Sequence, residues 1–275
     1  MEERKKTMKK LMIACAAALV GLSAAQAADI ESTNIVGYNT VTLKPGWNML
    51  AVNFKNVGND NGIGINDLFP GGGKTDTVFT PGSGAANADY IQVWDATEGE
   101  YTTYLLYKPA KGSSAAAYYW TDGSFKVTDK KFKNGDAFWF YKRGDADVEA
   151  TISGEVFLDE VEEVAIKPGW NMIGSFFPAG LVLNDEVYTP TYWQNSGAVS
   201  GSGAANADYI QVWDANVKEY TTYLLYKPSK GTSTATYTWT DGSFKTVTTD
   251  ILTAGKGAWY YHRGEGFSLE IKKQF

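Results

Sequence analysis

Residues 82–96 read GSGAANADYIQVWDA, and residues 201–215 repeat the same fifteen letters. The identity resumes after a short gap, because residues 100–109 and 219–228 both read EYTTYLLYKP. Over residues 82–126, the second copy matches the first at 37 of 45 positions. The chain is therefore a tandem duplication. Selection on this block and recent recombination between the two copies would each account for the near-identity.

The N-terminus predicts a cleaved signal peptide over residues 1–27. Two lysines lead into an apolar run over residues 11–22, and residues 25–27 (AQA) supply the small residues of a cleavage site. The run is too short to span a bilayer, so a retained anchor is less favoured. A lipoprotein acylated on Cys15 is less favoured too, because only four apolar residues of the run precede that cysteine. We therefore expect an exported protein that is periplasmic, on the outer surface or extracellular.

The mature chain is predicted to be acidic. Cleavage removes five of the 25 basic and two of the 31 acidic residues, which leaves 20 basic, 29 acidic and a net charge of −9. An acidic surface disfavours nucleic acid and anionic membranes as partners. The single cysteine leaves with the signal peptide, so no disulfide or thiol nucleophile is expected. No later segment reaches transmembrane length, so no membrane span is expected in the mature chain.

The start of each copy predicts a β-hairpin. Residues 41–43 (VTL) alternate apolar and polar side chains, and Pro45-Gly46 fits the central positions of a type II turn. An apolar strand over residues 47–52 follows in copy 1, and copy 2 repeats the whole pattern over residues 164–174. Two strands joined by such a turn read as a hairpin.

Further strands follow in the same order in both copies. Residues 90–95 and 101–108 predict a second hairpin, whose mismatches between the copies are confined to its tip. The dipeptides Asp122-Gly123 and Asp241-Gly242 fit a two-residue type I′ turn and predict a third hairpin. Residues 135–144 predict a final strand.

These patterns predict an all-β protein of two tandem duplicated domains. Each domain is expected to be a β-sandwich or a partly open β-barrel, because no mature segment keeps apolar residues at helical spacing. Residues 53–81 and 176–200 differ most between the copies and are predicted to be long loops. We expect copy 1 over residues 28–152 and copy 2 over residues 153–275.

Several short motifs resemble a repeat of predicted secreted proteins of Gram-negative bacteria. They are KPGWNM at residues 44–49 and 167–172, the (I/L)ND motif that follows, DYIQVWD with its hairpin, and a final G-x-(A/G)-(F/A)-W. Proteins with this repeat look like tandem β-domains built around a G-W-N strand and are largely uncharacterised. The resemblance spans nearly all of the mature chain and implies a fold, but it implies no catalytic residue.

No catalytic apparatus is predicted. The sole histidine, His262, stands where copy 1 has Lys142, so we expect it to be a surface variant and not a general base. Asp95 and Glu100 form a carboxylate pair that recurs in copy 2, but the pair flanks a turn, where acidic residues cap and solvate. We therefore predict that the protein is not an enzyme.

Neither a cofactor nor a metal site is predicted. Residues 70–75 (PGGGKT) lack the first glycine of a phosphate-binding loop, because residue 68 is leucine. Residues 59–62 (NDNG) resemble part of a calcium loop, but the positions that need acidic ligands hold Val57 and Leu68.

The aromatic residues are the remaining functional signal. Eight of the nine tryptophans fall into matched pairs between the copies, and Trp193 is the exception. Aromatic platforms flanked by amide and acidic groups are how β-sandwich modules bind sugars, whereas packing in the core is the simpler explanation. The candidate ligand-binding residues are Trp94, Trp213, Trp120, Trp239, Trp139, Trp259, Tyr141, Tyr261, Arg143 and Arg263.

Two functions are compatible with these patterns. The first is a secreted, non-catalytic cell-surface or extracellular protein with a structural or adhesive role. The second is a carbohydrate-binding protein with one aromatic site per domain. The partners expected are accordingly polysaccharide or other surface proteins, and the sequence leaves the oligomeric state open.

Overall fold

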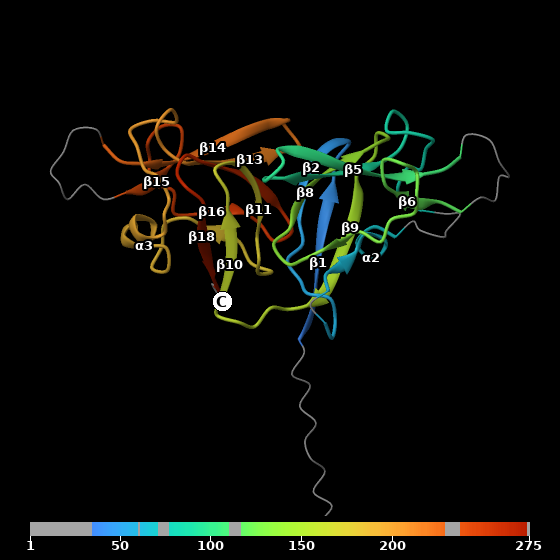
Figure 1. The fold of residues 1–275 in the computed structure, drawn as a ribbon, viewed down its shortest axis with the longest axis horizontal. Helices are drawn as coiled ribbons and strands as arrows, with labels where there is room; N and C mark the ends of the chain where they lie inside the picture. The colour runs from blue at the N-terminus through green and yellow to red at the C-terminus, as the bar shows by residue number, and fades with distance from the viewer. Residues whose placement is uncertain (1–34, 60, 71–76, 110–116, 229–236, 274–275) are drawn as a thin grey trace, which may run out of the picture. The chain divides into compact units, whose positions relative to one another are not determined.

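The computed structural model describes residues 35–59, 61–70, 77–109, 117–228 and 237–273. The described chain is all-β and consists of two similar halves, which confirms the predicted fold class (Figure 1). The predicted signal peptide over residues 1–27 lies outside the described residues. Among the described residues, no helix has the length and apolar character needed to cross a membrane.

Copy 1 is built around one antiparallel sheet of five strands. In spatial order the strands are β2 (Gly46–Ala51), β8 (Ala137–Lys142), β4 (Tyr90–Asp95), β5 (Glu100–Tyr107) and β6 (Tyr119–Thr121). Two antiparallel pairs accompany this sheet. They are β1 (Val36–Leu43) with β9 (Val148–Glu155), and β3 (Ile63–Gly64) with β7 (Lys131–Phe132).

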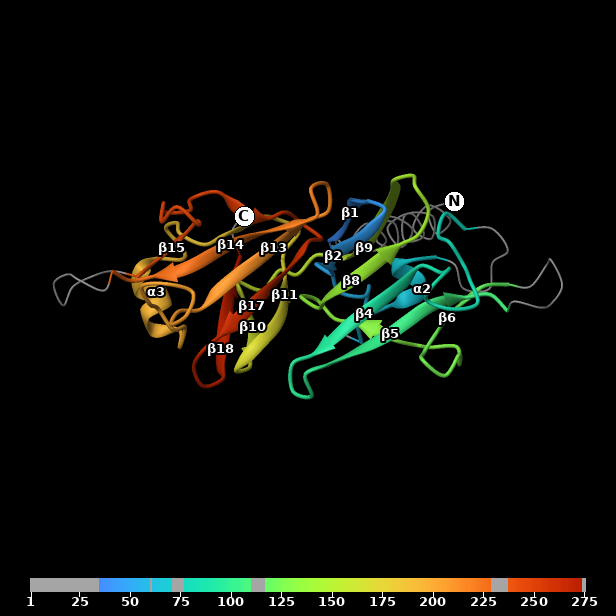
Figure 2. The ribbon, with the colours of Figure 1, turned by 90° about the horizontal axis from the view of Figure 1, so that it is seen from above.

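Copy 2 repeats this topology strand for strand (Figure 2). Its five-stranded sheet consists of β11 (Gly169–Gly174), β17 (Gly257–His262), β13 (Tyr209–Asp214), β14 (Glu219–Tyr226) and β15 (Thr238–Thr240). Its two-stranded pairs are β10 (Val161–Ile166) with β18 (Phe267–Lys272), and β12 (Leu181–Val182) with β16 (Asp250–Leu252). The duplication seen in the sequence is thus also a duplication of the fold.

The predicted first hairpin is wrong, because β1 and β2 belong to different sheets. The turn between them is a corner, for which Gly46 takes the positive φ of 93° that glycine tolerates best. Asn48 closes the corner: its side-chain oxygen accepts from Lys44 N at 2.8 Å, and its amide donates to Lys44 O at 2.7 Å. Asn171 makes the same bonds to Lys167 in copy 2. The K-P-G-W-N motif is therefore a corner that redirects the chain from one sheet to the next.

The second hairpin is confirmed, and the third has a different turn from the one expected. Strands β4 and β5 pair in register from Tyr90 opposite Leu105 to Asp95 opposite Glu100. At the third, the chain reverses through a wider loop in which Asp122 N donates to Lys126 O at 2.9 Å. There Phe125, and not Gly123, has the positive φ of 61°.

The two segments predicted to be long loops contain short regular elements. In copy 1 the segment holds β3 and the single-turn helix α2 (Ile65–Leu68), and in copy 2 it holds β12 and helix α3 (Pro190–Asn195). Thr189 caps α3 by accepting a hydrogen bond from Tyr192 N at 3.2 Å. Helix α3 carries the one unpaired tryptophan, Trp193, and its side chain is buried in the core of copy 2.

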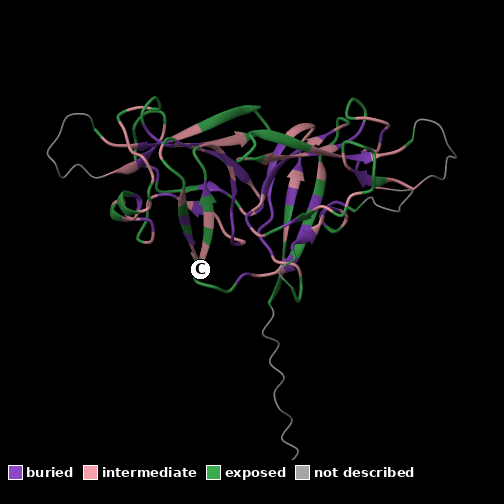
Figure 3. Ribbon diagram, viewed as in Figure 1, coloured by how far each residue is buried: buried purple, intermediate pink, exposed green. Residues whose placement is uncertain are grey.

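Each half has its own apolar core between its five-stranded sheet and its terminal strand pair. In copy 1, Val41 of β1 and Ile152 of β9 share one buried cluster with Leu50, Phe138 and Phe140 of the large sheet. Figure 3 shows these buried segments in purple. The terminal pair thus covers one face of the large sheet, which is the sandwich form of the predicted architecture.

The linker between the halves follows β9, which runs through Ser153 and ends at Glu155. Its first residue, Val156, donates its N–H to Ile35 O at 2.7 Å in copy 1. Its second residue, Phe157, is buried in the core of copy 2, and Lys55 Nζ of copy 1 lies 3.9 Å from the centre of that ring. The linker is therefore fixed to both halves.

Candidate functional site

The outer face of each large sheet, opposite its core, carries most of the aromatic residues singled out in the sequence. Directly paired residues of an antiparallel sheet point to the same face. Tyr141 of β8 lies opposite both Trp47 and Tyr90, whereas Trp139 lies opposite Met49. We call this surface the aromatic face of copy 1. It comprises Trp47, Met49, Tyr90, Gln92, Trp94, Tyr101, Trp139 and Tyr141.

Copy 2 presents the equivalent aromatic face with the same residue type at every position. It comprises Trp170, Met172, Tyr209, Gln211, Trp213, Tyr220, Trp259 and Tyr261. Three buried residues, Met49, Trp139 and Trp259, form the centre of a cluster to which both faces contribute. The two faces therefore pack against each other, and the tryptophans of both copies join the halves.

The contacts between the faces are reciprocal. Trp94 Nε1 donates to the carbonyl oxygen of Trp170 at 2.9 Å, and Trp213 Nε1 donates to that of Trp47 at 2.9 Å. The ring of Trp94 meets that of Trp259 edge-on, with centroids 5.7 Å apart. The equivalent contact of Trp213 with Trp139 has centroids 5.8 Å apart. These tryptophan contacts are thus made in both directions between the halves.

Trp94, Trp139 and their copy 2 equivalents are accordingly brought together by the structure. Trp139 and Trp259 are only 7% and 8% exposed, while Trp94 and Trp213 are half-buried. A cavity of about 230 Å³ remains between the faces, and its lining includes Gln92, Trp139 and Tyr220.

The predicted arginine–tyrosine pairs are also brought together. The guanidinium of Arg143 lies 4.4 Å from the ring centre of Tyr141, which stacks on Tyr90 with centroids 5.0 Å apart. Arg143 Nε also donates to Ala88 O at 3.4 Å, and its Nη2 donates to Ala85 O. The same group in copy 2 consists of Arg263, Tyr261 and Tyr209, with the guanidinium 4.9 Å from the ring centre of Tyr261. In both halves the arginine thus connects the edge of the aromatic face to the loop just before β4 or β13.

Trp120 and Trp239 lie apart from the aromatic faces. Both are fully buried in the cores, so neither indole has access to an external ligand. Trp120 Nε1 donates to Phe69 O at 2.9 Å. Among the described residues, nothing accepts a hydrogen bond from Trp239 Nε1. The ring of Trp193 lies edge-on to Trp239 with centroids 5.2 Å apart, a contact that copy 1 lacks the tryptophan to make.

Two grooves lie along the interface between the halves. The β1 groove has a volume of about 830 Å³ and places β1, with Asn39 and Thr42, opposite Trp213 and Tyr223. The β10 groove has a volume of about 650 Å³ and is its counterpart. It places β10, with Glu162 and Glu163, opposite Trp94 and Tyr104. Each groove is therefore lined by residues of both copies.

The two grooves differ in charge where the repeats have diverged. Lys256 in the β1 groove occupies the position of Asp136 in the β10 groove. Burial lowers the pKa of Lys256 and raises the pKa of Asp136. Asn39 lines the β1 groove. Its Nδ2 atom is buried, and no described residue accepts a hydrogen bond from it.

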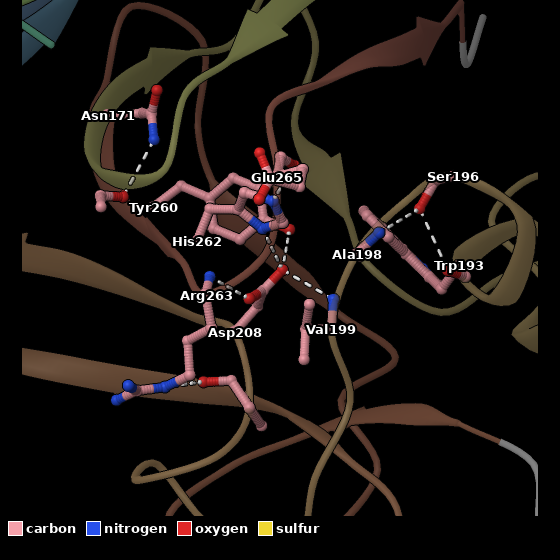
Figure 4. Close-up of polar contacts among 12 residues, drawn as sticks. Asn171, Trp193, Ser196, Ala198, Val199, Asp208, Tyr260, His262, Arg263 and Glu265 are labelled. Atoms are coloured by element: carbon pink, nitrogen blue, oxygen red, sulfur yellow. Dashed lines mark hydrogen bonds and ion pairs between the residues drawn. The ribbon is translucent and has the colours of Figure 1, made fainter. Parts of the chain in front are cut away.

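His262 is not a surface residue, so that prediction was wrong. Its side chain and that of Asp208 are fully buried, with Nδ1 2.9 Å from Asp208 Oδ2 (Figure 4). Its other nitrogen, Nε2, lies 2.5 Å from Glu265 O. Both ring nitrogens therefore face oxygen acceptors, one of a carboxylate and one of a backbone carbonyl. The pair is enclosed by protein, which leaves no room for a substrate.

The equivalent position in copy 1 is filled by another basic residue. Lys142 is buried, and its Nζ donates to Arg143 O at 2.7 Å. The neighbouring Asp89, the counterpart of Asp208, accepts from Thr80 N at 2.8 Å and from Arg143 N at 2.5 Å. Burial is the main cause that raises the pKa of Asp89. A buried basic residue near a buried aspartate is thus a shared structural feature of both halves.

The carboxylates considered for catalysis have a structural use. Asp95 accepts hydrogen bonds from Thr97 N at 2.8 Å and Glu98 N at 3.2 Å, and these bonds lower the pKa of Asp95. In the described residues, no group of three or more His, Cys, Asp or Glu side chains is placed to hold a metal ion. Residues 71–75 of the loop compared with a phosphate-binding loop, and Asp60 of the loop compared with a calcium loop, lie outside the described residues.

Comparison with known proteins assigns no family. No protein-family model, curated protein or solved structure matches the chain. The resemblance to the repeat of predicted secreted proteins therefore stays a prediction.

Proposed function

We propose that the chain is an exported, non-catalytic protein with a structural or adhesive role. The observation that carries this proposal is the use of the paired tryptophans, which join the two halves through their aromatic faces. Aromatic residues that would form open binding platforms in a sugar-binding module are used here for packing. The side chain of the one histidine is fully buried against Asp208, which further supports a non-catalytic role.

The test measures whether the chain binds to an immobilised material and whether it chemically converts that material. The purified mature chain is passed over immobilised polysaccharides and over immobilised envelope proteins of Gram-negative cells, and the products are analysed. We expect the chain to be retained on at least one surface without converting it. Turnover of any polysaccharide would contradict the non-catalytic role, and passage over every surface without retention would contradict the adhesive role.

Carbohydrate binding is the second candidate, and the β1 groove favours it. The groove combines the rings of Trp213 and Tyr223 with amide, hydroxyl and lysine side chains, including those of Asn39 and Lys256. Rings for stacking and polar groups for hydroxyls are what a sugar site requires. Such a site would lie between the halves, so each site would need both copies.

A glycan array with the native chain and three variants tests this candidate. For any glycan bound by the native chain, the variants Asn39→Ala and Lys256→Ala are expected to weaken binding about tenfold each, the effect of losing about 1.4 kcal/mol. Tyr38→Ala serves as the control, because Tyr38 neighbours Asn39 but is 77% exposed. Binding that is insensitive to both groove variants would exclude the β1 groove as the site.

A further inference from the structure

The two aromatic faces form an isologous interface within one chain. Trp94 and Trp213 each donate to the opposite half, and each of their rings meets the opposite Trp259 or Trp139 edge-on. Reciprocal contacts of this kind are the property of a two-fold symmetric dimer. The interface between the halves therefore resembles that of a symmetric dimer whose two subunits are connected by a linker.

Equivalent residues of the two copies meet each other at the centre of this interface. Ala51 at the end of β2 and Gly174 at the end of β11 are equivalent, and a Cβ atom on Gly174 would overlap that of Ala51. Ala137 and Gly257 are also equivalent, and a Cβ atom on Gly257 would lie 2.9 Å from that of Ala137 and 2.8 Å from Leu50 O. Contacts between equivalent residues place both pairs on the approximate two-fold axis.

The small residues at the axis make the two faces complementary to each other but not to themselves. In a pair of copy 1 faces, alanine would meet alanine at both axial positions, at separations where Cβ atoms overlap. In a pair of copy 2 faces, glycine would meet glycine, which leaves space unfilled. Only a copy 1 face against a copy 2 face places one methyl group in each axial position.

We propose that each aromatic face is a docking surface specific for the opposite face, and that its partner can be the opposite half of a second copy of this chain. The closed monomer and an exchanged oligomer then contain the same interface. The linker favours the closed form, because it holds the two faces at a high effective concentration. This inference goes beyond the proposed adhesive role and does not depend on it.

The test blocks one face at a time in the full chain. Variant A carries Met172→Glu and Trp213→Arg, which block the copy 2 face, and variant B carries Met49→Glu and Trp94→Arg, which block the copy 1 face. Each variant alone exposes one intact face. A chain with all four substitutions is the matched control, and light scattering after size-exclusion chromatography measures the mass.

The proposal predicts the strongest association when the two intact faces are opposite ones. An equimolar mixture of variants A and B is expected to form a heterodimer of twice the monomer mass, while variant A alone and the four-substitution control stay monomeric. Variant B alone is expected to associate more weakly than the mixture does. A monomeric mixture would overturn the proposal, and association of variant A alone as strong as that of the mixture would overturn its specificity.

The native chain provides a second measurement should the blocked variants fail to fold. Unfolded native chain is refolded at low and at high protein concentration, and both samples are then compared at the same final concentration. Exchanged dimers are expected only in the sample refolded at high concentration. Monomers alone in both samples would overturn the proposal.

Discussion

Trp94 donates its indole N–H across the join to the carbonyl oxygen of Trp170, with a nitrogen–oxygen distance of 2.9 Å. Residues that lie 76 positions apart in the chain thus share a hydrogen bond inside an apolar cluster. The bond pairs an indole N–H with a backbone carbonyl at a half-buried position.

Replacing Trp94 with Phe removes this hydrogen bond and keeps an aromatic ring at the position. We expect the free energy of unfolding to fall by about 1 kcal/mol or more, because the Trp170 carbonyl loses its partner. Urea unfolding measures the change. Trp213→Phe should cost a similar amount, since its bond to Trp47 O is equally long. An effect in only one copy would show that the two bonds are not energetically equivalent.

Replacing Gly257 with Ala adds a methyl group at the approximate two-fold axis. The new Cβ would lie 2.8 Å from Leu50 O and 2.9 Å from Ala137 Cβ, so the halves must shift apart. We expect a loss of about 1–3 kcal/mol in the free energy of unfolding, typical of overpacking. Gly84→Ala is the control, because nothing lies within 4 Å of a Cβ atom there. Equal effects of the two variants would contradict the close contact.

Replacing His262 tests its buried contact with Asp208 in copy 2. His262→Leu removes the imidazole that contacts the Asp208 carboxylate, and we expect a loss of about 1–3 kcal/mol, the usual cost of leaving a buried polar group without its partner. His262→Lys restores the residue of copy 1, where Lys142 fills the same position, and should recover part of that loss. Thermal unfolding of the three proteins measures the order. A leucine variant as stable as the native chain would show that the pair contributes nothing.

The stability effect of Asp136 is expected to depend on pH. Burial raises the pKa of Asp136 above its ordinary value of 3.8. The folded state therefore binds this proton more tightly than the unfolded chain does. The stability contributed by the group is complete below pH 3.8 and is lost as the pH rises through the raised pKa. Asp136→Asn should be more stable than the native chain at pH 7, with a smaller difference at pH 4.

Asp95→Asn is the opposite control for Asp136→Asn in urea unfolding at the two pH values. Backbone N–H groups lower the pKa of Asp95, so its contribution is present at pH 7 and is lost as the pH falls through the lowered pKa. The asparagine variant should therefore be less stable than the native chain at pH 7. If Asp136→Asn and Asp95→Asn shifted stability in the same direction at pH 7, burial would not be the cause of the raised pKa of Asp136.

The fold class could be predicted from the sequence because its signals are local or repeated. The duplication, the hairpin of β4 and β5 and the final strand all follow from spacing within short segments. The pairing of β1 could not be predicted, because its partner β9 follows about a hundred residues later and no local pattern names it. The turn at Asp122 was missed for a different reason: its side chain accepts from Ser124 N and Lys126 N, which stabilises a wider loop.

The candidate site was predicted in composition but not in arrangement. Strand alternation grouped Tyr90 with Trp94, and Trp139 with Tyr141, but only the register of β4 with β8 unites them on one face. That this face packs against its counterpart depends on contact between the halves, which periodicity does not encode. The burial of Lys142 had a signal in the sequence, because Lys142 alternates in step with the buried Phe138 and Phe140.

The strand pairs that close each half determine how the molecule responds to tension. Val36 lies opposite Glu155 and Leu43 opposite Val148, and in copy 2 Val161 lies opposite Lys272. The first and last strands of each half are therefore paired so that the two ends of that half lie side by side at one end of the strand pair. Pulling on those ends breaks one bridge at a time and never loads all bridges together, so each half yields at low force.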